Sequence, residues 1–149
     1  MSRVPELIGG VVTALTALPE LEAVGVTDGP LVTDSGATEW ILVGFDGNGD
    51  GDFTAATSEL EPAGSLRMSE TISLTVALVA SRGDTDVAAV RTRVYELYAA
   101  VVGYLNANPG GPLAGAETTV SGYSLSQLQT RDGMQARIAL TLTARTFTL

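Results

Sequence analysis

The first hydrophobic residues of the chain recur at steps of three and four, the spacing of one face of a helix. This pattern predicts a helix over Val4–Leu18, capped by Ser2 and ended by Pro19, because proline cannot continue a helix. Gly9 and Gly10 weaken this helix unless another segment comes close to their backbone. Its apolar stripe is Val4, Leu7, Ile8, Val11, Val12, Leu15 and Leu18.

A second stripe with helical spacing predicts a helix over residues 87–105. Gly83–Asp86 supplies a turn and an N-cap in front of it. Arg91 and Arg93 lie on its polar side, where Glu96 can pair with them. Its apolar stripe is Val87, Val90, Val94, Leu97, Tyr98, Val101 and Leu105.

Long alternations of apolar and polar residues predict strands in the second half of the chain. Met68–Ser81 alternates as a half-exposed strand does. Residues 118–129 have strand-like content, a hairpin turn is expected at 130–133, and Met134–Leu149 forms the longest strand.

Shorter strands are expected before residue 62. Trp40–Phe45 is a continuous apolar run with β-branched and aromatic members, which is typical of a central strand buried on both faces. Leu21–Val26 and residues 53–61 are candidates for two further short strands. We therefore expect one domain, residues 1–149, of the α+β class, with a mixed, mainly antiparallel β-sheet whose long strands are packed by two helices.

The length of the last strands has a geometric consequence. A strand of 14 to 16 residues spans about 45 to 50 Å, whereas a compact chain of this length is only about 40 Å across. The strands should therefore bend sharply, or their ends should project. Phe147 and Leu149 place apolar groups on the polar side of the last strand and are candidate oligomer contacts. A bulge and a frayed terminus are the alternative explanation.

Composition argues against an enzyme. The chain contains 0 Cys and 0 His, and its 8 basic residues are all Arg. Nucleophilic sites that use a His base, the usual zinc sites and lysine Schiff bases therefore cannot form. We expect a binding or structural protein.

Charge is strongly negative and unevenly spread. The net charge is −9, and the isoelectric point is about 4.2. Residues 1–61 hold 1 Arg against 11 acidic residues, a charge of −10, whereas residues 62–149 hold 7 Arg against 6 acidic residues, a charge of +1. Such a protein does not grip nucleic acid, and two unlike faces suit self-assembly. No apolar run approaches the length of a membrane span, so we expect a soluble protein that does not bind membranes.

One motif has the chemistry of a cation site. Oxygen-bearing residues alternate with glycine after the central strand, the spacing with which a calcium loop wraps its ion. Asp46, Asn48, Asp50 and Gly51 match the first, third, fifth and sixth positions of an EF-hand loop, but Thr57 stands where the bidentate Glu is needed. A flexible turn is the favoured interpretation, with no cofactor or at most weak Ca²⁺ binding. The candidate ligands are Asp46, Asn48, Asp50 and Asp52.

Several segments together resemble a known family. Trp40–Phe45 and the acidic loop after it, Arg67–Thr71 leading into a long strand, Gly83–Arg91 opening a helix, and the final hairpin resemble small neck proteins of tailed phages that infect actinobacteria. The closest type is the tail-terminator family. The likeness covers nearly the whole chain in order of elements, and the absence of Lys fits a high-GC genome.

The resemblance implies a mixed α/β subunit without catalytic residues. It implies a ring, usually a hexamer, that caps the finished tail tube and joins it to the head. The expected partners are further copies of the chain, the tail tube protein and a head-closure or connector protein, while DNA passes without specific binding. The expected location is the virion, after assembly in the host cytoplasm. A head-closure or tail-completion protein is one alternative, and a small Ca²⁺-dependent binding module is another.

Overall fold

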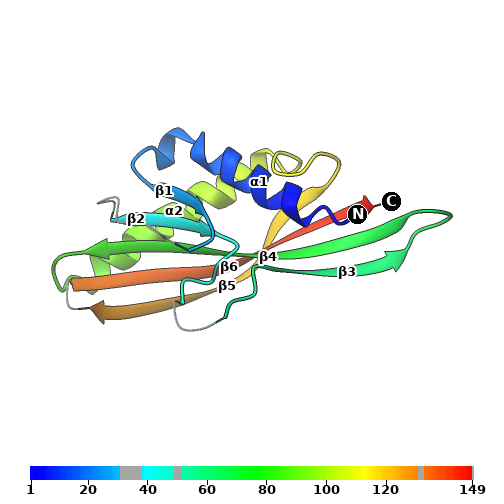
Figure 1. The fold of residues 1–149 in the computed structure, drawn as a ribbon. Helices are drawn as coiled ribbons and strands as arrows, with labels where there is room; N and C mark the ends of the chain where they lie inside the picture. The colour runs from blue at the N-terminus through cyan, green and yellow to red at the C-terminus, as the bar shows by residue number, and fades with distance from the viewer. Residues whose placement is uncertain (31–37, 49–51, 131–132, 149) are drawn as a thin grey trace.

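The computed structural model describes residues 1–30, 38–48, 52–130 and 133–148. These residues form a six-stranded, mainly antiparallel sheet with two helices on one face (Figure 1), which confirms the predicted α+β class. The elements are α1 (Val4–Thr16), a 3₁₀ helix η1 (Pro19–Leu21), β1 (Gly25–Asp28), β2 (Glu39–Val43), β3 (Ala56–Pro62), β4 (Met68–Arg82), α2 (Val87–Ala107), β5 (Glu117–Thr130) and β6 (Gly133–Thr148).

The strands lie in the order β1-β2-β4-β6-β5, and among the described strands the pairing of β1 with β2 is the parallel one. The long strand β4 organises the sheet. One edge of β4 pairs with β6 from its first residue to its last. Its other edge pairs with β3 over residues 68–74 and with β2 over residues 76–80. Two short strands therefore share one edge of a long one.

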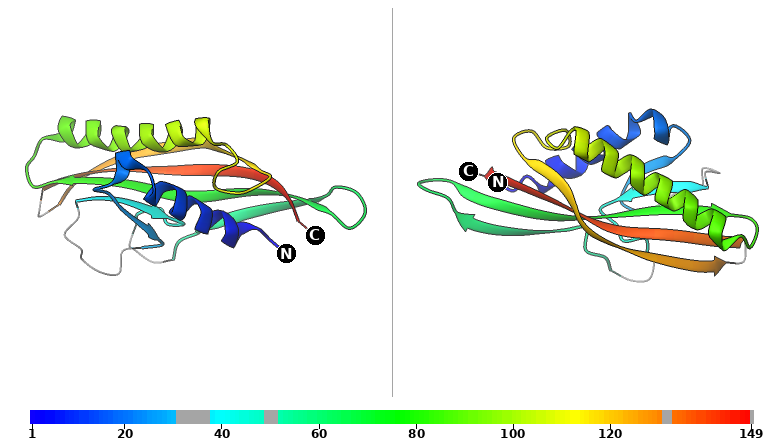
Figure 2. Two further views of the ribbon diagram at one scale, coloured as in Figure 1. Left: turned by 90° about the horizontal axis from the view of Figure 1, so that it is seen from above. Right: turned by 180° about the vertical axis from the view of Figure 1, so that it is seen from behind.

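The helices cover the sheet side by side. Helix α1 packs on β1 and β2, and α2 packs on β4, β5 and β6 (Figure 2). Both predicted apolar stripes are confirmed as the faces that meet the sheet, except that Val87 at the start of α2 is exposed. The buried helical residues are Leu7, Val11 and Leu15 of α1 and Val90, Val94, Leu97, Val101 and Leu105 of α2.

The start of α1 corrects one prediction and confirms another. Arg3, and not Ser2, occupies the cap position, without a capping side chain. The Ser2 hydroxyl accepts a hydrogen bond of 3.2 Å from the Val4 N–H and donates one to Glu70. Gly10 is required, because a Cβ there would lie 1.8 Å from the carbonyl oxygen of Pro112. A close approach therefore accounts for this glycine, whereas a Cβ at Gly9 would meet nothing within 4 Å.

Several element boundaries differ from the prediction. The strand expected over Trp40–Phe45 ends at Val43, and the one expected over residues 53–61 begins at Ala56. Helix α1 ends at Thr16 rather than Leu18, because the chain turns there into η1. The strand predicted over Leu21–Val26 is instead the end of η1, a turn closed by the hydrogen bond from the Val24 N–H to the Leu21 carbonyl, and the first half of β1. Leu21 and Val24 are apolar because they are buried, and not because they lie in a strand.

Strand β2 is buried on both faces, as predicted. Ile41 and Val43 belong to the main core under the helices. Leu42 points to the opposite face and packs in a second, smaller cluster with Phe45 and Val79. Alternate residues of this one apolar run therefore pack in two hydrophobic clusters, one on each face of the sheet.

The long strands project, which is one of the two outcomes that their length allowed. Strands β4, β5 and β6 have 15, 14 and 16 residues. The hairpin of β3 and β4, with the end of β6 beside it, extends beyond both helices (Figure 2). We call residues 56–74 and 142–148 the arm. A bulge between Val120 and Gly122 also bends β5.

Candidate assembly surfaces

The arm exposes large apolar side chains. Leu60 on β3 is 55% exposed, Leu66 in the turn between β3 and β4 is 91% exposed, and Phe147 near the end of β6 is 51% exposed. Leu66 also has a φ of +65°, a left-handed conformation that costs a leucine about 1 to 2 kcal/mol. An isolated monomer gains nothing from an exposed leucine held in this way. The arm therefore has the character of a contact surface.

The guanidinium of Arg67 lies over the ring of Phe147. The guanidinium carbon of Arg67 lies 4.1 Å from the ring centroid, a cation–π contact. Arg67 makes no ion pair with a carboxylate in the part of the chain that the structure describes. We call Leu66, Arg67 and Phe147 the arm tip. It is apolar and positively charged.

A buried carboxylate joins the base of the arm to the start of α1. Glu70 of β4 is 0% exposed. Its side-chain oxygens accept hydrogen bonds from the hydroxyls of Ser2 and Ser58, both at 2.5 Å, and from the backbone N–H of Arg3 at 2.9 Å. The Arg3 guanidinium in turn donates to the hydroxyl of Thr146 on β6 at 2.7 Å. The terminal segment and three strands of the arm therefore meet at one point.

The environment of Glu70 favours its charged form. Burial alone would raise its pKa, but the three hydrogen bonds to the carboxylate outweigh this effect and hold the pKa below its ordinary value. Glu70 is thus a satisfied buried anion. This arrangement supports a structural role in orienting the arm.

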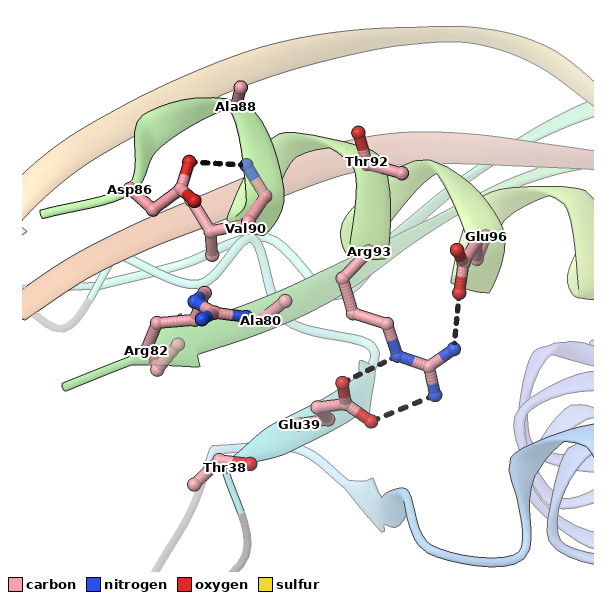
Figure 3. A pocket seen from close by; sticks show the side chains of 12 residues that line it. Thr38, Glu39, Ala80, Arg82, Asp86, Ala88, Val90, Thr92, Arg93 and Glu96 are labelled. Carbon is pink, nitrogen blue, oxygen red and sulfur yellow. Dashed lines mark hydrogen bonds and ion pairs between the residues drawn. The ribbon is translucent and has the colours of Figure 1, made fainter. Parts of the chain in front are cut away.

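A polar cleft lies between α2 and the ends of β2 and β4, with a volume of about 740 Å³ (Figure 3). Its centre is Arg93, whose guanidinium binds Glu39 of β2 through two hydrogen bonds of 2.5 and 2.9 Å and Glu96 through one of 2.8 Å. The hydrogen bonds to Glu39 and then to Glu96 raise the pKa of Arg93 above its ordinary value. The predicted pairing of Glu96 is confirmed for Arg93, whereas Arg91 donates a hydrogen bond of 3.2 Å to Gln127. Because the Arg93 guanidinium already binds two carboxylates, these ion pairs join α2 to β2 and stabilise the packing of the helix on the sheet.

A second groove runs along α2 where it faces the end of α1. It has a volume of about 590 Å³ and a mostly apolar lining. Small residues of α2, among them Ala99 and Gly103, line it together with Leu18 and Tyr104. We call it the α2 groove, and the residues used below are Leu18, Glu20, Glu96, Ala99, Gly103 and Tyr104.

Three tyrosines form a cluster on the other side of α2. The Tyr98 and Tyr123 ring centroids lie 4.8 Å apart, and Tyr95 lies 6.0 Å from Tyr123. The hydroxyls of Tyr95 and Tyr123 are 3.1 Å apart. Tyrosines of this kind are common in protein interfaces, and here they pack partly on each other.

The candidate calcium loop lies against a fixed cation. A Cβ at Gly47 would lie 2.4 Å from Cδ of Arg137, so the loop backbone rests on the arginine side chain. Asp46 accepts a hydrogen bond from the backbone N–H of Asn48 at 2.8 Å, which is a turn within the loop. A guanidinium beside the loop weakens its attraction for Ca²⁺.

Part of this loop lies outside the described residues. Asp52 is exposed, and Asp50 is not described. No group of three or more acidic side chains is placed to hold a metal within residues 1–30, 38–48, 52–130 and 133–148. Weak Ca²⁺ binding therefore stays a prediction.

The predicted oligomer contacts at Phe147 and Leu149 stay a prediction. The structure places Phe147 on the exposed side of the arm, and Leu149 lies outside the described residues. Sequence reasoning missed Leu60, Leu66 and Glu70. The signal for Glu70 was available, because a charged residue stands in the apolar row between Met68 and Ile72.

No protein-family model matches the chain, and no curated protein matches it significantly. None of the helices within the described ranges is long and apolar enough to cross a membrane. Proposals about function therefore rest on the exposed surfaces of the arm and of α2.

Proposed function

We propose that this protein is a subunit of a phage tail-terminator ring, which caps the tail tube and joins it to the head. The single observation that carries the proposal is the arm, which extends beyond the helices and exposes Leu60, Leu66 and Phe147. In a monomer these side chains remain in water. In a ring, each arm reaches the neighbouring subunit and buries them.

A ring follows from the position of the arm. A projecting element that binds a different surface of the next copy makes a heterologous contact, and such contacts produce rings when the rotation closes. The two helices and the arm offer such unlike surfaces. A hexamer is the ring size that the sequence resemblance implies.

The charge of the chain supports a passage for DNA. A net charge of −9 repels phosphate, so DNA passes through the ring without specific binding.

The same charge gives a reason why rings do not stack. Residues 1–61 carry a charge of −10, and their acidic side chains outside the arm and the contacts within the ring would repel a second ring, because like charges placed across an interface are unfavourable.

The ring has two kinds of partner. One face binds the tail tube protein, and the other binds a head-closure or connector protein. The protein is located in the neck of the virion after assembly in the host cytoplasm. It carries out no catalysis, and its work is self-association and docking.

Polymerising tail-tube subunits of the same phage test this proposal. Tubes formed with the purified protein should be shorter and should carry a ring at one end in electron micrographs. Tubes of equal length with and without the protein would contradict a terminator. If the protein instead sealed DNA-filled heads against leakage, the head-closure function would replace the terminator function.

A further inference from the structure

We infer that the arm tip of one copy inserts into the α2 groove of the next copy. This inference rests on the ring proposed above and names the two surfaces that meet in it. The occupant of the groove is a second copy of this chain, supplying Leu66 and Arg67 with Phe147 beside them.

The shapes of the two surfaces fit. Leu66 is 91% exposed at the outermost turn of the arm. Small residues of α2 line the groove, and a Cβ added at Gly103 would meet nothing within 4 Å. The groove is therefore open at Gly103, where a leucine side chain from another copy can pack with Leu18 and Tyr104 among the lining residues.

The charges of the two surfaces are complementary. Arg67 makes no ion pair in the described ranges and lies beside apolar groups. The groove contains Glu20 and Glu96, with Arg93 as its positive group. Arg93 also binds Glu39, which lies next to the groove, through two hydrogen bonds. The carboxylates of Glu20, Glu39 and Glu96 therefore outnumber the one guanidinium, and the net charge at the groove is negative. An unpaired arginine of a neighbour compensates this charge.

The arm tip cannot reach the α2 groove of its own chain. The turn between β3 and β4 extends past the ends of both helices (Figure 2). The α2 groove is instead lined mainly by residues of α2, with Leu18 and Glu20 from the segment after α1. The contact must therefore be intermolecular. It joins two different surfaces, which makes it heterologous and able to close a ring.

Two glycine substitutions test the groove. Gly103→Leu fills it from within, and Gly9→Leu is the matched control, because Gly9 is also exposed on a helix with nothing within 4 Å of a Cβ. Both changes favour the helix, since Leu has the higher helix propensity. In sedimentation of the full chain, Gly103→Leu should weaken self-association by about ten-fold or more, the effect of losing an important contact, and Gly9→Leu should not. Equal association of the two variants would overturn the inference.

A charge exchange tests the pairing of the two surfaces. Arg67→Glu and Glu20→Arg should each weaken association, and the double variant should recover much of it. Glu22→Arg is the control, because Glu22 is exposed two residues away and does not line the groove. Failure of the double variant to recover, with both single variants folded as judged by circular dichroism, would overturn the pairing.

The outcomes separate this inference from the proposed function. Rings that form equally well in Gly103→Leu leave the ring standing and remove the groove from it. Loss of association in Tyr123→Ala but not in Gly103→Leu would move the contact to the tyrosine cluster, again against the groove. A wild-type chain that stays monomeric at every concentration would overturn both the ring and the groove contact.

Discussion

The carboxylate of Glu70 accepts a hydrogen bond of 2.9 Å from the backbone N–H of Arg3, a residue 67 positions earlier in the chain. This bond joins the start of the first helix to the strand that runs out into the arm. The Ser2 and Ser58 hydroxyls complete the site, so the carboxylate has partners on two segments. We conclude that Glu70 fixes the arm relative to the helices.

Replacing Glu70 by Gln should destabilise the protein. The amide keeps the shape of the side chain but loses the charge, and its NH₂ group faces donors. We expect the free energy of unfolding to fall by about 1.5 to 3 kcal/mol, the range for hydrogen bonds to a charged group. Urea denaturation measures it. Glu61→Gln, an exposed residue of β3, is the control and should stay within about 0.5 kcal/mol of the wild type.

The contribution of Glu70 should depend on pH. Its pKa is lower in the folded protein than in the unfolded chain, so the folded state binds this proton more weakly. Its stabilisation is therefore complete above the unfolded-state pKa of about 4.3 and is lost as the pH falls through the lower folded pKa. The difference in unfolding free energy between the wild type and Glu70→Gln should shrink in that acidic range. A difference that stays constant down to about pH 2 would contradict this assignment.

Two glycines with the same backbone conformation separate strain from packing. Gly29 and Gly47 both have a φ of +85°. A Cβ at Gly29 meets nothing within 4 Å, whereas one at Gly47 collides with the Arg137 side chain. Gly29→Ala should cost about 1 kcal/mol and Gly47→Ala about 2 to 4 kcal/mol in thermal unfolding. Equal losses would show that the loop does not rest on Arg137.

Calcium should have little effect on stability. Arg137 already places a positive charge beside the loop that holds Asp46 and Asn48, so a cation gains little there. Calorimetry with micromolar Ca²⁺ should show almost no rise in Tm, and a chelator should not unfold the protein. A large rise in Tm would instead support a Ca²⁺-dependent binding module.

The fold was predictable where a pattern is local and repeats. The stripe Val90, Val94, Leu97 and Val101 defines α2 because every buried position recurs at the helical period. The buried run in β2 was equally clear. Leu21 and Val24 misled the prediction because burial in a turn gives the same short apolar pattern as a strand. A short segment does not distinguish the two.

The features that define the candidate surfaces depend on contacts far apart in the sequence. Glu70 is a charge in an apolar row, a signal that the sequence analysis did not use, and its partners at residues 2, 3 and 58 come from other elements. Strand length predicted that strand ends would project or bend, and Phe147 was found in this way. Leu66 was not, because an exposed leucine in a turn is visible only once the turn is placed at the outermost point of the arm.

The mass and shape of the assembled protein test the central claim most directly. Light scattering after gel filtration, with electron micrographs of the same fractions, should show a closed ring of several 15.3 kDa chains. Phe147→Ser should shift the distribution towards smaller species while the fold is retained, because the arm loses an exposed apolar contact. A wild-type chain that remains a 15.3 kDa monomer up to its solubility limit would contradict the account.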